Sequence, residues 1–307
     1  MKKRITVILA AIFYISAVSA QDYARHRVDV NYGAGFAGSI YDKTDESYIY
    51  AAYSLGSVLE LKYAYFFAPK WGVSIGTGIS FFTAKGVLNM DGVIPHYNDP
   101  AFDPSGQQYY DLHYKADNLS ERQRIWALET PLQFHFEHRF AGNRQGIYAG
   151  LGAKGYFPFA AQSTFPQDNG TLTLTGYEAF TDTRYTEPPY FGRQDVRKTP
   201  ATTKLQYSID AIADFGGLFR ISDACDLFVG VYGSYGLMDV LPKTGDKKDF
   251  ITPEHNSLFY VNSLLSSNIF GKYNNYIQDN HLSRKKTDEK WNRLQAGIKI
   301  GIHFKMK

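Results

Sequence analysis

The sequence predicts an all-β chain that forms an eight-stranded, antiparallel, up-and-down transmembrane β-barrel with long extracellular loops. Two observations carry this prediction. Eight segments alternate between apolar residues and small or charged residues, which is the period of a strand with one apolar face. The connections between these segments alternate between short and mostly long ones, a pattern typical of barrels in bacterial outer membranes.

The clearest segment is residues 291–304, the last of the eight. From Leu294 to Phe304 every second residue is apolar, and the residues between them, Lys299 included, are small, polar or charged. The other strands are predicted, in order, at residues 27–38, 53–65, 71–83, 125–137, 146–157, 204–217 and 227–237. Interior positions must be small or paired, because a barrel of eight strands has room inside only for packed side chains.

Some positions within these strands carry their own expectations. Pro131 predicts a bulge or a local break in pairing, because proline cannot donate to the ladder. In the sixth strand Leu205 and Tyr207 are expected to face outward, with Asp210 and Asp214 inward.

The connections are predicted as a short loop at 41–50, tight turns at 66–70, 138–145 and 220–226, and long loops at 84–124, 158–203 and 238–290. Alternation over 171–175 predicts a hairpin above the membrane. Apolar residues with helical spacing predict a short helix over 258–268, resting on the barrel mouth. An even number of strands places both termini on one side, which is expected to be the periplasm.

Residues 1–20 have the features of a signal peptide: a basic start at residues 2–4, an apolar core and the small residues Val18, Ser19 and Ala20. The expected organisation is therefore a signal peptide, 1–20, and an outer-membrane barrel domain, 21–307. The residue directly after the expected cleavage point is Gln21 and not a cysteine, which argues against a lipoprotein anchor. The formal charge of +3 arises from residues 2–4 alone, and the 30 remaining Lys and Arg balance the 30 Asp and Glu. This balance gives no support to nucleic-acid binding.

Aromatic residues make up 16% of the chain, with 24 Tyr and 22 Phe. In a membrane barrel they form belts at the two interfaces, and the candidates near strand ends are Tyr63, Tyr65, Trp71, Trp126, Phe136, Phe157 and Trp291. The mean hydropathy of -0.32 argues against a helical membrane bundle. The single cysteine, Cys225, is interpreted as a small residue in a tight turn.

Charged residues on the inward faces form the candidate site. Eight of them are expected to lie inside the barrel: Glu60, Lys62, Glu129, Lys154, Asp210, Asp214, Arg293 and Lys299. The main interpretation is a packed ion-pair network that plugs the barrel. A gated path for ions or protons through the same residues is the alternative.

Other chemistry finds little support. Ser80, Ser208 and Ser234 share no level and face with a histidine, so no catalytic residues are predicted. No cofactor or metal site is expected either, since the loop residues in question lack ligand spacing: His96, His113, His255, His281, Asp91, Asp99 and Asp103. A sugar-binding platform is conceivable for the loop aromatics Tyr185, Tyr190 and Phe191.

Short motifs along the chain resemble the PorT/OmpA-like outer-membrane barrels of Bacteroidota. The run L-E-T-P-L at 128–132 resembles their L-E-x-P-L strand, and Y-G-L-M-D-V at 235–240 resembles the end of their penultimate strand. Residues 176–177, 261–266 and 297–299 also fit that family. Many OmpA-like proteins continue into a peptidoglycan-binding domain, whereas this sequence stops at Lys307, so the resemblance implies location and not peptidoglycan anchoring.

The sequence thus predicts a non-catalytic integral protein of the outer membrane, acting in envelope structure or through extracellular-loop interactions. Expected partners are outer-membrane lipid and lipopolysaccharide, the barrel-assembly machinery and an unknown extracellular ligand, but no nucleic acid. Two alternatives stay open. One is a narrow channel or a transport or secretion accessory barrel. The other is a soluble, secreted ligand binder whose apolar face would point inward, against which the glycine-rich polar face argues.

Overall fold

The computed structural model describes most of the chain from Arg25 onward. The described residues are 25–41, 48–52, 54–97, 110–140, 142, 144–165, 170–178, 181–186, 191–194, 201–240, 248–249, 251–254, 258–261, 263, 267–268, 275–278, 281–284 and 291–306. The predicted signal peptide lies outside them. Within this part of the chain, no helix is long and apolar enough to cross a membrane.

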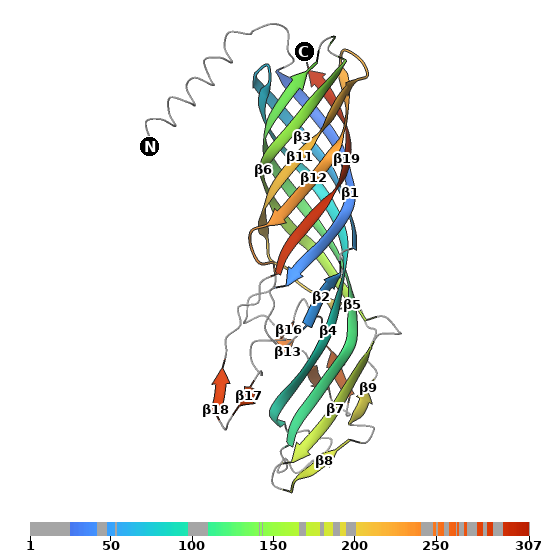
Figure 1. Ribbon diagram of the computed structural model, residues 1–307, viewed down its shortest axis with the longest axis vertical. Helices are drawn as coiled ribbons and strands as arrows, with labels where there is room; N and C mark the ends of the chain where they lie inside the picture. The colour runs from blue at the N-terminus through green and yellow to red at the C-terminus, as the bar shows by residue number, and fades with distance from the viewer. Residues whose placement is uncertain are drawn as a thin grey trace, which may run out of the picture.

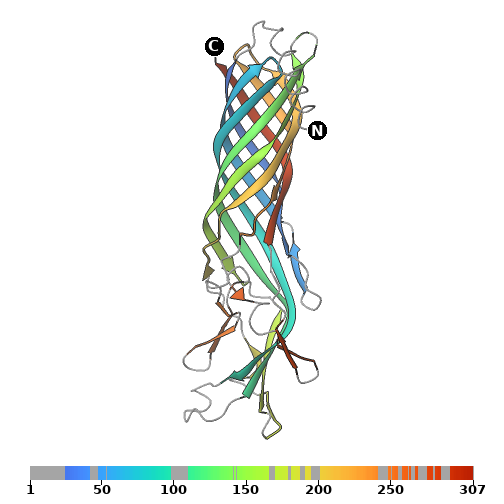
Figure 2. The same cartoon turned by 90° about the vertical axis from the view of Figure 1, so that its left-hand side faces the viewer.

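Eight strands form a closed antiparallel barrel, as predicted (Figures 1 and 2). In ring order they are β1 (His26–Tyr41), β3 (Ser54–Ala68), β4 (Trp71–Tyr97), β5 (Tyr110–Arg139), β6 (Gln145–Thr164), β11 (Ser208–Arg220), β12 (Cys225–Gly236) and β19 (Trp291–Met306). Pairing of β1 with β19 closes the ring, with His26 opposite Met306. The start of β1 and the end of β19 therefore lie at the same end of the barrel, where the tight turns also lie (Figure 1).

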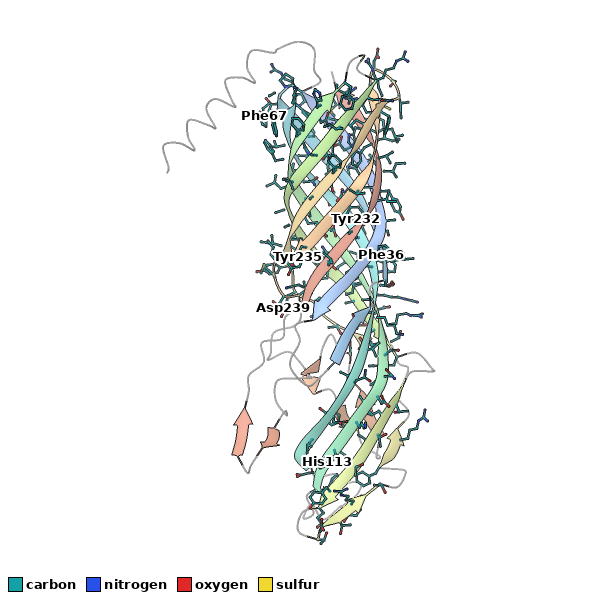
Figure 3. All side chains as sticks on the ribbon, viewed as in Figure 1. Phe36, Phe67, His113, Tyr232, Tyr235 and Asp239 are labelled. Carbon is teal, nitrogen blue, oxygen red and sulfur yellow. The ribbon has the colours of Figure 1, made fainter. Side chains whose placement is uncertain are left out.

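The two faces of the strands are oriented as the alternation predicts. Lys299 is 3% exposed, whereas its neighbours Ile298 and Ile300 are 67% and 48% exposed. The same alternation runs around the ring, with apolar side chains outside and charged, polar or glycine residues inside. Figure 3 shows these side chains projecting from the outer wall, Phe36 among them. A soluble ligand binder with an apolar interior is therefore the wrong reading of this alternation.

Glycines make room inside the narrow barrel. Gly216 of β11 and Gly230 of β12 lie directly opposite each other beside the ring of Phe228. A Cβ atom at Gly230 would lie 2.3 Å from the backbone oxygen of Phe215 and 2.7 Å from Cζ of Phe228. A side chain at either position would have to displace that ring, so the glycine pair allows the aromatic residue to fill the interior.

Two barrel strands continue far beyond the mouth, where a long loop at 84–124 was expected. β4 extends to Tyr97 and β5 begins at Tyr110, so both run through most of that loop as a paired hairpin. The loop prediction is therefore wrong for most of its length. Asn118 has a left-handed φ of 52°, and its backbone N–H donates to Oδ1 of Asn89 at 2.6 Å. The pairing register shifts between Leu88 and Met90, next to this residue, so the hairpin carries a bulge there.

Further strands widen this hairpin into a sheet outside the barrel, here called the distal sheet. It consists of the outer parts of β4 and β5 together with β2 (Tyr48–Ala52), β7 (Thr171–Glu178), β8 (Thr183–Tyr185) and β9 (Gly192–Gln194). β2 pairs with β4, and β7 pairs with β5, β8 and β9. The hairpin predicted from residues 171–175 is formed by β7 and β8, and β7 also pairs with β5 over a longer stretch. Figure 2 shows the distal sheet beyond the barrel mouth.

The helix expected over 258–268 is wrong. β15 (Leu258–Val261) is a strand that pairs with β14 (Ile251–Glu254), while Leu264 and Leu265 lie outside the described residues. Aromatic and β-branched residues in Leu258–Val261 favour a strand. The spacing of apolar residues in so short a run cannot by itself distinguish a helix from a strand. The remaining short strands are β10 (Ala201–Thr202), β13 (Lys248–Asp249), β16 (Ser267–Asn268), β17 (Asn275–Gln278) and β18 (His281–Arg284).

Two smaller expectations have different outcomes. The β4–β5 ladder skips Thr130 and Pro131, which confirms a local break at the proline. The sixth barrel strand begins at Ser208, later than expected, and Leu205 does not face outward. Leu205 instead packs against a buried cluster at the barrel mouth that includes Phe82 and Val240.

Candidate functional site

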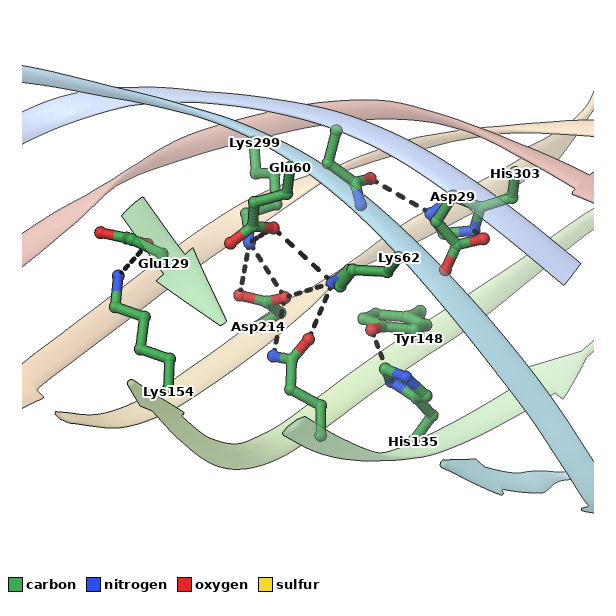
Figure 4. Close-up of polar contacts among 12 residues, drawn as sticks. Asp29, Glu60, Lys62, Glu129, His135, Tyr148, Lys154, Asp214, Lys299 and His303 are labelled. Atoms are coloured by element: carbon green, nitrogen blue, oxygen red, sulfur yellow. Dashed lines mark hydrogen bonds and ion pairs between the residues drawn. The ribbon is translucent and has the colours of Figure 1, made fainter. Parts of the chain in front are cut away.

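The centre of the barrel holds a group of paired charges around Lys299. Its Nζ lies 2.9 Å from Oε2 of Glu60 and 3.1 Å from Oδ1 of Asp214 (Figure 4). Nζ of Lys62 lies 3.5 Å from the same Asp214 carboxylate and donates to Oε1 of Gln133 at 2.7 Å. Gln133 in turn donates to Asp214 at 3.1 Å. Two cations thus share two carboxylates and one amide, which joins β3, β5, β11 and β19 across the interior.

A second group of charges lies nearer the mouth. Lys154 and Glu129 are 2.6 Å apart, and Nη1 of Arg293 lies 3.3 Å from the other oxygen of Glu129. Arg293 also pairs with Asp210. The guanidinium carbon of Arg293 lies 3.5 Å from the centre of the Tyr156 ring, which adds a cation–π contact.

The structure therefore brings all eight predicted site residues into the interior, where every one of them is buried. They comprise four cations and four carboxylates, and each has an oppositely charged partner among the other seven. An unpaired charge at such a depth is strongly unfavourable, and pairing removes most of that penalty. The arrangement can hold strands together across the barrel, and it leaves none of the eight charges unpaired.

A third group near the tight turns was missed by sequence reasoning. Nε of Arg27 lies 2.5 Å from Oδ1 of Asp29, and Arg27 also pairs with Glu137. The alternation had already placed these residues on inward faces. The missing information was that β1 and β5, which are not neighbours in the ring, face each other at this level.

Aromatic and imidazole side chains fill the interior beside this third group. The Tyr148 hydroxyl and Nδ1 of His135 form a hydrogen bond of 2.6 Å, and the His303 ring stacks on Phe228 at 5.5 Å between centres. Tyr148, Phe228 and Leu218 form a buried apolar cluster. This end of the interior is therefore filled by ring systems as well as by ion pairs.

The mouth of the barrel is closed by an apolar cluster and by parts of the long loops. The cluster consists of Ala37, Phe82, Ala84, Ile125, Ala127, Tyr156, Ala161 and Val240. Val240 comes from the segment after β12, and the buried Ser263, from the same long connection, donates to Oε1 of Glu121 at 2.6 Å. No alternation links these two residues to the barrel, so their positions at the mouth could not be predicted from the pattern of the strands.

Within the described residues, the other candidate serines, histidines and aspartates are not brought together as a catalytic or metal site. Ser80, Ser208 and Ser234 are buried, and within the described residues none of them is hydrogen-bonded to a histidine. No cluster of three metal-ligating side chains occurs in the described part of the chain, although His255, Asp99 and Asp103 fall outside it.

The two loop aromatics that the structure describes, Tyr185 and Phe191, pack against each other. Phe191 is only 2% exposed and stacks on Tyr185, with ring centres 5.8 Å apart. It also meets Tyr110 edge-on at 5.4 Å. Phe191 is therefore a packing residue of the distal sheet, and Tyr190 lies outside the described residues.

Comparison with known proteins identifies no family. No family model matches the chain, and no curated protein matches it. The resemblance to PorT/OmpA-like barrels therefore stays a prediction.

Several solved structures are similar over most of their length. Neisserial surface protein A is 9% identical, with a TM-score of 0.34, and the match covers 93% of this chain and 100% of that one. The outer membrane protein OprG from Pseudomonas aeruginosa is 13% identical, with a TM-score of 0.34 and coverage of 93% and 99%. The attachment invasion locus protein Ail of Yersinia pestis is 12% identical, with a TM-score of 0.26 and coverage of 90% and 99%.

Proposed function

We propose that this chain is an integral, non-catalytic β-barrel of the bacterial outer membrane that holds the distal sheet outside the cell. Its role would be in envelope structure or in contacts made by that sheet. The termini would lie in the periplasm, because tight turns occur on that side of such barrels and long connections on the outer side.

The apolar outer wall of the barrel is the observation that carries this proposal. Outward side chains on every barrel strand are large, apolar and exposed, among them Phe36 at 66%, Leu55 at 71% and Leu151 at 66%. An apolar surface of this extent is unfavourable in water. Trp126 and Phe136 mark the two ends of this face on β5, and ten residues of a strand tilted by about 45° span roughly 23 Å, close to the apolar band of about 25 Å in such barrels.

Aromatic pairs at both ends of the wall support a membrane position. The ring centres of Phe81 and Trp126 lie 4.6 Å apart near the mouth. Those of Trp71 and Phe136 lie 4.8 Å apart at the tight-turn end. Aromatic residues at both edges of an apolar band are typical of membrane interfaces.

The filled interior favours a structural role over transport. Ion pairs, ring systems and the mouth cluster occupy successive levels of the barrel. A narrow channel, the alternative function, requires a polar path that these paired side chains would have to open.

Fractionation of cells, followed by electrophoresis of unboiled and boiled membrane samples, tests the proposal. The protein is expected in the outer-membrane fraction and should migrate differently before and after boiling. Ile298→Lys places a charge on the lipid side, at a cost of about 2–4 kcal/mol near the midplane, and should deplete the heat-modifiable form, whereas Ile298→Val should preserve it. Protein found in a soluble fraction without detergent would contradict the proposal.

A further inference from the structure

Three cations gather on the outside of the barrel at its mouth. Lys85 of β4 and Arg122 and Arg124 of β5 are exposed and lie on the outward faces of these strands. Lys85 lies directly opposite Arg122. Arg124 lies opposite Thr83, and this pair is two residues closer to the barrel along both strands. The three side chains thus form one patch across two neighbouring strands, here called the mouth patch.

Among the residues that the structure describes, the mouth patch has no anionic partner. Like charges directly opposite each other in an antiparallel sheet repel and destabilise the pair, yet Lys85 and Arg122 occupy such a position. None of the three cations forms an ion pair with a described carboxylate. Glu121, which immediately precedes Arg122 in sequence, is buried on the opposite face, where it accepts the Ser263 hydrogen bond. An anion from outside the chain would relieve this repulsion.

The level of the mouth patch identifies the anion. Phe81 and Trp126, at the end of the apolar wall, lie two residues closer to the tight turns than Thr83 and Arg124 on the same strands. Two residues of a strand tilted by about 45° rise roughly 5 Å along the membrane normal, which is the depth of the headgroup region beyond the hydrocarbon. The outer leaflet would present the phosphates of its lipid headgroups at this level.

The chemistry of the patch also suits phosphate. Arginine presents a planar fork of donors that matches phosphate oxygens, and lysine adds a point charge. On the adjoining strand β6, Gln162 lies opposite Arg124 and Thr164 lies opposite Arg122. Their side chains can supply further hydrogen bonds beside the two guanidinium groups.

We propose that the mouth patch, Lys85, Arg122 and Arg124, binds the phosphate groups of lipid A in the outer leaflet. This inference rests on the proposed outer-membrane position. It assigns a site to the expected lipid partner, and it places that site on the β4–β5 side of the barrel.

The test uses the full chain in detergent and measures binding of diphosphoryl lipid A and of its dephosphorylated form. The wild type is expected to bind the phosphorylated form about tenfold or more tightly, since charge-assisted hydrogen bonds supply the difference. The variant Lys85→Ser/Arg122→Ser/Arg124→Ser should lose this preference. The matched control Arg25→Ser/Lys70→Ser/Arg144→Ser, which removes three exposed cations at the opposite end, should keep it.

Three outcomes would overturn the inference: equal binding of both lipid forms, loss of the preference in the control variant, or displacement of the lipid by inorganic phosphate at equal concentration. The last would indicate a site for free phosphate. If the triple variant does not fold, Arg124→Gln is expected to lose part of the preference, and an unchanged preference would contradict the site. A heat-modifiable outer-membrane barrel without the preference would refute this inference alone, whereas soluble protein would refute the proposed function.

Discussion

At the scale of single residues, Lys299 is the most consequential position. It pairs with Glu60 and Asp214 at the centre of the barrel and is nearly inaccessible. Lys299→Glu would bring three carboxylates together, and breaking a buried pair costs about 3–5 kcal/mol. We expect the heat-modifiable form to be lost, or to unfold at a much lower denaturant concentration.

The neighbouring residue provides the control for this prediction. Ile300 faces outward, so Ile300→Val removes one methylene group from the outer face of the barrel and should cost less than about 1.5 kcal/mol. Equal losses of stability in Lys299→Glu and Ile300→Val would contradict the assignment of inward and outward faces.

Two tyrosines of the distal sheet should respond to alkaline pH. Tyr177 donates to Asp182 at 3.1 Å and Tyr185 donates to Glu178 at 2.8 Å, and these hydrogen bonds raise the pKa of both phenols. Because the folded state then holds these protons more tightly, the contribution to stability is complete below the unfolded pKa of about 10 and is lost as the pH rises through the folded pKa.

Carbon-13 labelling of tyrosine and NMR titration would measure these values. Both resonances, identified by Tyr177→Phe and Tyr185→Phe, are expected to titrate above the free tyrosine value of about 10. Asp182→Asn should lower the pKa of Tyr177 and leave Tyr185 unchanged. A shift of both residues in that variant would show that the two hydrogen bonds are not independent.

At the scale of elements, β5 shows where sequence reasoning succeeds and where it stops. Its barrel part was predicted because the alternation from Ile125 onward is regular. The segment before Ile125 is rich in Asp, Pro, Gly, Tyr and His, which favours a loop. In the structure this outer part is a strand whose buried positions run 112, 114 and 116 and then 119, 121 and 123. The extra residue at Asn118 changes the phase of the alternation, and a search for a constant period of two ends there.

Asn118 is therefore a test of the bulge. A β-branched residue in the left-handed region is disfavoured by about 1–2 kcal/mol, whereas glycine adopts it freely. Asn118→Val should make the distal sheet easier to cleave with trypsin, for example after Lys115, while the heat-modifiable migration of the barrel stays unchanged. Asn118→Gly should be cleaved at the same rate as the wild type. If both variants were cleaved equally faster than the wild type, the result would count against the bulge.

Across the whole molecule, local patterns predicted the number of barrel strands, their order and their faces. The pairing of side chains across the interior, such as Arg27 with Glu137, depends on the register of strands that are not neighbours in the ring. Closure of the mouth depends on Val240 and Ser263, which belong to no regular pattern. The eight network residues were thus predicted as a set, whereas their partners follow only from three-dimensional positions.

The filled interior leads to a prediction for the whole barrel. Purified protein inserted into planar lipid bilayers is expected to show no stepwise conductance, because paired charges, rings and the mouth cluster occupy the lumen in succession. Heat-denatured protein in the same detergent serves as the control for leaks. Reproducible ohmic steps from the folded protein alone would instead favour the narrow channel.

The continuity of β4 and β5 from the barrel into the distal sheet has a mechanical consequence. These strands are paired to each other on both sides of the mouth, and β5 is also paired to β6 inside the wall. A force that pulls on the distal sheet is therefore carried along the strand axis and loads many hydrogen bonds in parallel, as shear. A hinged loop would transmit such a force through one backbone connection. This hairpin is instead built as a stiff tether between whatever touches the distal sheet and the wall of the barrel.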